Sequence, residues 1–365
     1  MDFLDEIGAS VSSNIQLIRK MNGGKISQEQ LYDAVDGMLK MTPYKNDENV
    51  RNKLIEVAEF NNKTWMDSAH TLASEDKNWS DWLTKAKPEI SWLYWNRYAQ
   101  LLRKNGFSPN VIETLDETID ETLGQLTNPA QEGSWDRRGM VVGSVQSGKT
   151  ANYTGLICKA ADAGYKVIIV LAGFHKNLRS QTQIRIEEGF LGYDKSEPGN
   201  HKIIGVGNIA HDHKKLWPDA ATTRADNGDF GAGESKNFAN SIDRPLVFVI
   251  KKNNSVLENL IRYLKGQGMA QKGITDPEQS APISGIPLLL IDDESDQGSI
   301  NTNKTNIRVA DPDEDETPDP EIDPTVINGL IRTVLNTFEQ SAYVAYTATP
   351  FANIMIHKNS ESPKF

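Results

Sequence analysis

Residues 143–150 of the sequence have the types and spacing that bind phosphate groups. They read Gly-Ser-Val-Gln-Ser-Gly-Lys-Thr, which fits the G-x-x-x-x-G-K-[ST] spacing of a phosphate loop. Glycines let backbone N–H groups turn toward a triphosphate, and the N-terminus of a following helix adds its dipole. We therefore predict an ATP-binding loop made of Gly143, Ser144, Val145, Gln146, Ser147, Gly148, Lys149 and Thr150.

Two residues at the end of this loop have separate predicted roles. Lys149 is expected to reach the β- and γ-phosphates and so to take part in catalysis, and Thr150 is expected to bind Mg²⁺ through its hydroxyl. The flanking pattern agrees with a phosphate loop rather than a chance glycine-rich turn. A short apolar run at 140–142 predicts a buried strand, and residues 151–163 predict a helix that Gly164 ends.

An acidic run follows the apolar stretch 287–291. Carboxylates at the carboxyl end of a strand in an open α/β sheet face the ligand crevice. We predict that Asp293 binds the Mg²⁺ and that Glu294 polarises the attacking water. Asp292 is the alternative metal ligand, because side chains alternate along a strand and only one of the two aspartates can point at the site.

A third stretch, Thr347-Ala348-Thr349-Pro350, follows the predicted strand 343–346. Its hydroxyl groups would hydrogen-bond the acidic run and sense whether a γ-phosphate is present. We count Thr349 among the predicted catalytic residues on this basis.

Length and composition limit the class of protein. A chain of 365 residues with 38% hydrophobic and 24% charged residues is typical of a soluble protein with two domains. No apolar run is long enough to cross a membrane, and acidic residues stand where a signal peptide would be basic, so we expect a cytoplasmic location. The net charge of −11 argues against a generally basic nucleic-acid surface. The single cysteine, Cys158, excludes an internal disulfide and is expected in the core.

The hydrophobic periodicity divides the chain in two. Helical spacing predominates up to about residue 127, which predicts an all-helical N-terminal domain over 1–134. From residue 135 to 365, strands alternate with helices, the pattern of an α/β domain with a mostly parallel sheet and flanking helices. The predicted strands are 140–142, 166–171, 202–206, 246–251, 287–291 and 343–346.

Three further features of the sequence lie outside these motifs: Trp135, the stretch 211–240 and the stretch 311–323. Trp135 precedes the phosphate loop, where an adenine ring could stack on it. The glycine- and aspartate-rich stretch 211–240, with His211 and His213, predicts an insertion or a mobile loop and no metal site. The acidic stretch 311–323 predicts a solvated segment rather than a calcium loop, because Glu316 and Ile322 stand where a glycine and a carboxylate are needed.

Together these motifs resemble superfamily-two helicases and translocases, with GSVQSGKT as motif I, DESD as motif II and TATP as motif III. Leu178 to Gln181 looks like the L-x-x-Q of motif Ia, which contacts the nucleic-acid backbone in that superfamily. More closely, RRGMVVGSVQSGKTANYTGLI, NLRSQTQIR, VIKKNNSVLENL, LLLIDDESD and AYTATPFANI look like the Z-one domain family, labelled endonucleases of prokaryotic restriction and phage-defence loci. The resemblance covers roughly 135–356.

The resemblance implies a DNA-directed ATPase with two RecA-like lobes. The chain ends at Phe365, just past the third motif, so we expect only the first lobe here and the second lobe with its arginine finger to be missing. Such a finger contributes ~10³-fold or more to turnover. ATP hydrolysis by this chain is therefore expected to be weak or absent.

Three functions follow as expectations. The first is the ATP-binding motor lobe of a DNA translocase in restriction or antiviral defence, with DNA contacts from Lys176, Arg179, Gln181, Arg185, Lys251 and Lys252. The second is an ATP-dependent switch that recruits a nuclease or methylase partner. The third is an endonuclease, for which we find no separate cluster of carboxylates and lysine outside the ATP motifs.

Overall fold

The computed structural model describes most of the helices and strands of the chain. It covers residues 3–21, 28–62, 80–107, 109–142, 148–174, 176–196, 201–209, 217–225, 227–231, 243–276, 279–295 and 324–347. Four predicted features lie outside these described residues: the loop residues 143–147, Thr349, the acidic stretch 311–323 and the histidines at 211 and 213.

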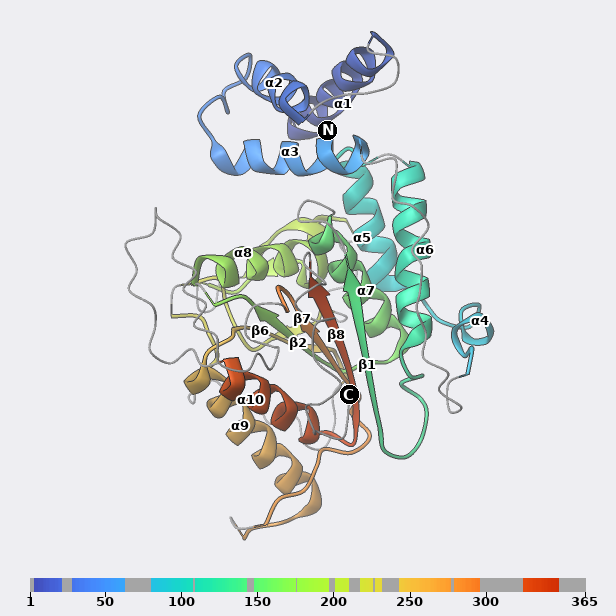
Figure 1. Ribbon diagram of the computed structural model, residues 1–365, viewed down its shortest axis with the longest axis vertical. Coiled ribbons are helices and arrows are strands. Elements are labelled where there is room, and N and C mark those ends of the chain that lie inside the picture. The colour runs from blue at the N-terminus through green and yellow to red at the C-terminus, as the bar shows by residue number, and fades with distance from the viewer. Residues whose placement is uncertain are drawn as a thin grey trace.

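A six-stranded sheet forms the centre of the molecule (Figure 1). Its strand order is β1-β8-β7-β2-β6-β5, and all neighbouring strands run parallel. This confirms the predicted α/β architecture with a mostly parallel sheet. The strands are β1 (Trp135–Val142), β2 (Val167–Ala172), β5 (Asp219–Ala220), β6 (Leu246–Lys251), β7 (Leu288–Asp292) and β8 (Gln340–Thr347).

This strand order brings together segments that are distant in the sequence. β8 lies between β1 and β7, with Thr347 opposite Val142 and Ala345 opposite Asp292. The carboxyl ends of parallel strands meet at one edge of a sheet, which is where open α/β sheets bind ligands. The end of the predicted phosphate loop, the acidic run and the start of the third motif therefore share one edge.

Different helices cover the two faces of the sheet. Ile168 and Val170 of β2 belong to a core shared with α5, α6 and α7, whereas Val167, Ile169 and Leu171 belong to a core shared with α9 and α10. Successive side chains of a strand point to opposite faces, so an uninterrupted apolar strand is buried on both. In Figure 1, α9 and α10 lie below the sheet and α8 lies above it.

The helices account for most of the remaining described regular structure. A short π-helix, η1 (Glu187–Leu191), continues α8 directly, and a 3₁₀ turn, η2 (Gly205–Asn208), packs near it. No described helix is long and apolar enough to cross a membrane. The α-helices are α1 (Phe3–Met21), α2 (Gln28–Leu39), α3 (Glu48–Asn62), α4 (Leu83–Ala86), α5 (Leu93–Lys104), α6 (Pro109–Gln125), α7 (Lys149–Ala163), α8 (Lys176–Ile186), α9 (Asn254–Lys272) and α10 (Pro324–Asn336).

The helices α1 to α6 belong to two different cores. α1, α2 and α3 enclose a small core of their own around residues such as Val11, Val35 and Ala58. α5 and α6 instead pack with α7 and the sheet in one continuous core. Apolar contacts therefore cross the predicted domain boundary at residue 134, and a separate all-helical domain remains a prediction.

The strand predicted at 140–142 forms, but its burial was predicted wrongly. It is the end of β1, where Met140 is 43% and Val142 is 51% exposed. β1 lies at the edge of the sheet, and β8 is its only partner among the described strands. An edge strand can be apolar without being covered on both faces.

The strand predicted at 202–206 was also placed wrongly. Only β4 (Lys202–Ile203) forms, and it pairs antiparallel with β3 (Tyr193–Asp194) outside the main sheet. Gly205, two residues after the strand, begins η2 with a φ of 49°, and a Cβ there would lie 2.0 Å from the Glu188 carbonyl oxygen. This close backbone approach requires glycine and turns the chain into η2.

Candidate active site

The described end of the predicted phosphate loop lies at the start of α7. Gly148 is the N-cap residue and has a φ of 71°, in the left-handed region that glycine adopts without a Cβ clash. Lys149 and Thr150 form the first turn of the helix, whose N-terminus carries the positive end of the helix dipole. The local structure around these residues suits an anion.

Lys149 reaches across the sheet edge to the acidic run. Its Nζ lies 3.2 Å from Oε1 of Glu294, and its side chain is only 9% exposed. Glu294 has a φ of 53°, the only positive φ of a non-glycine residue in the described parts of the chain. Such a conformation costs roughly 1–3 kcal/mol and marks a position that the surroundings enforce.

The two aspartates of the acidic run have different environments. Asp292 is fully buried; its Oδ1 forms an ion pair with Lys252 Nζ at 2.7 Å, and its Oδ2 accepts a hydrogen bond from the Tyr343 hydroxyl at 2.6 Å. Asp293 instead lines a cavity at the sheet edge. This placement agrees with the predicted side-chain register, while the metal-binding role of Asp293 remains a prediction.

Backbone hydrogen bonds hold the acidic run in place. Asp293 N–H donates to the Leu171 carbonyl at 3.0 Å, and Ser295 N–H donates to the Tyr346 carbonyl at 3.0 Å. Lys252 Nζ also donates to the Glu294 carbonyl at 2.7 Å. These bonds come from β2, β8 and the end of β6, and together they fix the unusual turn at Glu294.

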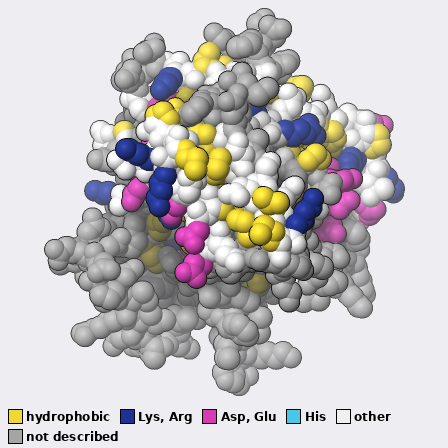
Figure 2. All heavy atoms as spheres, turned by 90° about the horizontal axis from the view of Figure 1, so that it is seen from above, with side chains coloured by type: hydrophobic (Ala, Val, Ile, Leu, Met, Phe, Trp, Pro, Cys, Tyr) yellow, Lys and Arg dark blue, Asp and Glu magenta, His cyan; other side chains and the backbone are white. Residues whose placement is uncertain are grey.

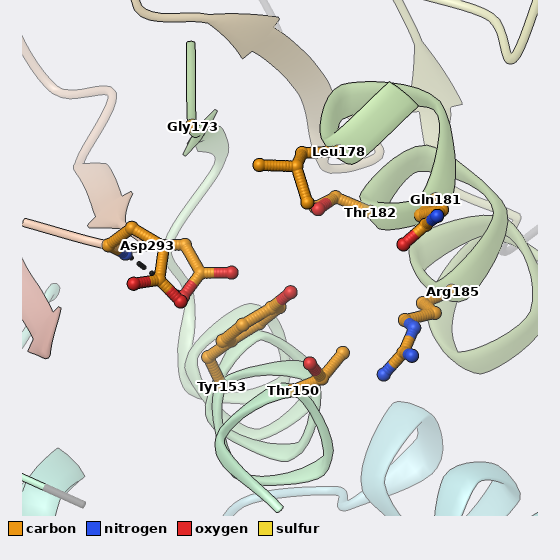
Figure 3. Close-up of a pocket in the computed structure, with 9 residues that line it drawn as sticks. Thr150, Tyr153, Gly173, Leu178, Gln181, Thr182, Arg185 and Asp293 are labelled. Carbon is orange, nitrogen blue, oxygen red and sulfur yellow. Dashed lines mark hydrogen bonds between the residues drawn. The ribbon is translucent and has the colours of Figure 1, made fainter. Parts of the chain in front are cut away.

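A cavity of about 150 Å³ lies between α7, α8 and the acidic run (Figure 3). Thr150 and Tyr153 come from α7, and Asp293 and Glu294 form the opposite wall. Burial, followed by the neighbouring charge of Glu294, raises the pKa of Asp293, and the charges of Lys149 and Lys252 partly offset this. The volume holds several water molecules.

The remaining wall of the cavity comes from the end of β2 and from α8. Gly173 packs closely here, since a Cβ on it would lie 2.9 Å from the Leu178 side chain. The α8 residues that line the cavity are Leu178, Gln181, Thr182 and Arg185. The motifs in the sequence did not point to Tyr153 or Thr182. The sequence did carry a signal for them: Tyr153 lies one helical turn after Thr150, and Thr182 lies one helical turn after Leu178, so each pair shares a helix face.

The donors at this cavity suit Mg²⁺ with a polyphosphate. A threonine hydroxyl and a single carboxylate are hard oxygen ligands, and Mg²⁺ usually takes only one or two carboxylates and completes its shell with phosphates and water. Thr150 and Asp293 face the same cavity and fit this pattern. No group of three or more His, Cys, Asp or Glu side chains able to hold a metal occurs among the described residues.

The third motif is described only up to Thr347, which is fully buried at the end of β8. The preceding Tyr346 donates its hydroxyl hydrogen to Oδ1 of Asn152 in α7 at 2.8 Å. Since the Tyr346 carbonyl also accepts from the acidic run, the end of β8 contacts both halves of the site. Thr349 lies outside the described residues.

Two of the predicted DNA contacts were wrong. The Lys252 side chain is fully buried in its ion pair with Asp292. The Arg179 side chain is 2% exposed and donates to the carbonyls of Thr223 and Ala225 at 2.8 Å each. Neither side chain can reach a DNA phosphate from these positions.

The other predicted DNA contacts stay predictions. Lys176 and Gln181 are exposed and Lys251 is half-buried. Figure 2 shows basic and acidic side chains interspersed on one face of the described chain, without a broad basic patch there. On that face, a nucleic-acid contact would depend on a few local cations.

The described part of the stretch 211–240 does not fit a mobile loop, while an insertion stays a prediction. Within it, β5 adds a sixth strand beside β6. Its backbone carbonyls at Thr223, Arg224 and Ala225 accept hydrogen bonds from Arg179 and Ser180 of α8. Polar side chains on α8 thus anchor this segment, which its composition did not indicate.

Trp135 does not stack near the phosphate loop. It starts β1, and strand geometry places it about 23 Å from Val142 at the other end. Its Nε1 donates to the Gln131 carbonyl, and its ring meets Tyr165 edge-on at 6.1 Å.

Cys158 is buried in the core, as predicted.

Comparison of the chain with protein-family models, with curated proteins and with solved structures finds no match.

Proposed function

We propose that this chain is the ATP-binding lobe of a superfamily-two helicase-like DNA translocase, with a RecA-like sheet, acting in restriction or antiviral defence. One observation carries the nucleotide part of the proposal. Lys149 at the start of α7 and Glu294 after β7 pair at 3.2 Å beside a cavity that Thr150 and Asp293 also line. Lys149 and Glu294 are 145 positions apart in the sequence, and their contact supports the proposal because a lysine beside hydroxyl and carboxylate oxygens suits a phosphate group with its metal ion.

Each residue has a role in this proposal. Lys149 and the backbone N–H groups at the start of α7 bind the phosphates, while Thr150 and Asp293 hold the Mg²⁺. The bound Mg²⁺ would supply positive charge to the β- and γ-phosphate oxygens. Phosphates compete with Glu294 for Lys149, and the freed carboxylate then orients the attacking water.

The experiment is titration of a fluorescent ATP analogue in the presence of Mg²⁺. Removing a charge-assisted contact weakens binding by about 1.5–3 kcal/mol, so Lys149→Ala should weaken it at least about tenfold. Lys265→Ala, an exposed lysine on α9, is the matched control and should bind as the wild type does. Equal affinities for the wild type and Lys149→Ala would refute the proposed site.

A regulatory switch that recruits a nuclease or methylase partner is the alternative for the same site. Affinity for the ATP analogue with and without DNA separates the two, and it does not depend on turnover, which is expected to be weak in this chain. A higher affinity in the presence of DNA, which by linkage means tighter DNA binding in the ATP-bound state, supports the translocase. ATP binding that DNA does not change favours the switch. The endonuclease expectation gains no support from the described residues, in which no separate metal cluster occurs.

A further inference from the structure

One stripe of α8 faces the cavity. Leu178, Gln181, Thr182 and Arg185 are spaced i, i+3, i+4 and i+7, so they lie on one side of the helix. Figure 3 shows these side chains opposite Asp293, with Arg185 directed toward Thr150. The stripe therefore lines the cavity, with Thr182 buried, Arg185 half-buried, and Leu178 and Gln181 at its exposed rim.

The cavity needs positive charge if a triphosphate is to enter. Asp293 and Glu294 place two carboxylates on one wall, and Lys149 is the cation that already pairs with one of them. Like charges at close range repel, and a triphosphate adds several more negative charges. Arg185 brings a guanidinium to the opposite wall.

α8 is anchored from its other side. Arg179 and Ser180 bind the carbonyls of 223–225, and Gln183 donates to both the Glu187 carboxylate at 3.0 Å and the Thr222 carbonyl. These buried contacts hold the helix backbone, so Arg185 is presented from a rigid element. Rigid presentation reduces the cost of ordering a charged side chain when a ligand binds.

We propose that Arg185 binds the terminal phosphate of the nucleoside triphosphate, across the cavity from Asp293 and Glu294. The inference rests on the proposed nucleotide site and adds a residue to it. A guanidinium presents a planar fork of donors that matches two phosphate oxygens. Arg185 thereby distinguishes triphosphate from diphosphate, and it replaces the DNA contact that its position in the sequence had suggested.

The test compares two ligands, adenosine 5′-(β,γ-imido)triphosphate and ADP, each with Mg²⁺, by isothermal titration calorimetry. Arg185→Gln should weaken the triphosphate analogue about 10- to 100-fold and change ADP affinity less than about twofold. Arg185→Lys keeps the charge without the fork and should recover part of the loss. Arg262→Ala on α9, an exposed arginine, is the control and should change neither affinity.

The outcomes separate this inference from the proposed function. The role of Arg185 would be overturned if both variants, Arg185→Gln and Arg185→Lys, changed the affinities for the triphosphate analogue and for ADP by the same factor. It would also be overturned if neither variant changed the affinity for either ligand. If the wild type binds neither ligand, or if Lys149→Ala binds both as tightly as the wild type, the proposed nucleotide site itself fails. Thermal unfolding of each variant establishes that the binding data come from folded protein.

Discussion

Lys252 and Asp292 form a fully buried ion pair beneath the candidate site. Burying two charges costs several kcal/mol per ion, which close pairing offsets only when further polar partners are present. Here Tyr343 binds the carboxylate, and Lys252 also binds the Glu294 carbonyl. The pair therefore serves to position the turn at Glu294 more than to stabilise the fold.

Substitutions at this pair should separate the two roles. Lys252→Met leaves the Asp292 carboxylate buried without its cation and should lower the free energy of unfolding by about 3–5 kcal/mol. The triple variant Lys252→Met, Asp292→Leu, Tyr343→Phe removes all three polar partners and should recover most of that loss. Urea unfolding measures both values.

The matched control for this series is Lys251→Met, at the half-buried neighbouring lysine, which should change the free energy of unfolding by less than about 1 kcal/mol. A Lys252→Met variant as stable as the control would contradict the argument. So would a triple variant no more stable than Lys252→Met alone.

Sequence patterns predicted single residues of the site better than their partners. Alternation along β7 separates Asp292 from Asp293, which the structure bears out in their placement. The pattern did not show that Lys252 pairs with Asp292, because β6 and β7 are not neighbours in the sheet order and the contact joins the last residue of β7 to the residue after β6. Contacts between side chains on separate elements depend on packing, which local spacing does not specify.

Among the elements, the buried strands were the most predictable. The apolar runs of β2, β6 and β7 lie within one residue of their predicted bounds, since continuous apolar character over about six residues is typical of strands buried on both faces. The edge strand β1 and the two-residue strand β5 were predicted incompletely or missed. Their formation depends on pairing to a neighbour rather than on their own composition.

The N-terminus of α5 shows how one helix completes another. Its N-cap position, Trp92, supplies no capping side chain. Asp162 of α7 takes that role and accepts from the backbone N–H groups of Tyr94 and Trp95 at 3.0 and 2.9 Å. Burial raises the pKa of Asp162 to about 7, although these N–H donors lower it.

This raised pKa gives a pH dependence with a defined sign. The folded state holds the Asp162 proton more tightly than the unfolded state does, and this difference adds to the free energy of unfolding. The contribution is fully present below an ordinary aspartate pKa of about 4, and it is lost as the pH rises toward 7. Relative to Asp162→Asn, the wild type should lose up to about 1.4 kcal/mol per pH unit between pH 5 and 7.

Urea unfolding at pH 5, 6 and 7 measures this dependence, with the exposed Asp243→Asn as the control variant. Wild type and Asp243→Asn should show the same slope. Parallel pH profiles for the wild type and Asp162→Asn would show that the buried carboxyl does not titrate in this range.

For the whole molecule, the hydrophobic cores show which helices fold together with the sheet better than the change from helical to strand patterns in the sequence does. Lys159 of α7 is buried between α6 and α5, with Nζ 2.5 Å from both Asp116 and Asp120 and 4.9 Å from the centre of the Trp95 ring. The helix that begins with Lys149 is thus held by α5 and α6. These two helices are part of the α/β unit that carries the candidate site.

Truncations test this division directly. Removing residues 1–79 takes away α1–α3, whose core is mostly their own, and the remaining chain should unfold cooperatively and bind the ATP analogue within about threefold of the full chain.

Removing residues 1–134 also deletes α5 and α6 and exposes the apolar side of α7. Each large apolar side chain contributes roughly 1.5–3 kcal/mol on burial, so losing even five removes an amount comparable with the whole stability of a typical domain, about 5–15 kcal/mol. The 135–365 fragment should therefore aggregate or lack a cooperative transition by circular dichroism, and a well-folded 135–365 fragment would instead support the domain boundary that the sequence pattern predicted.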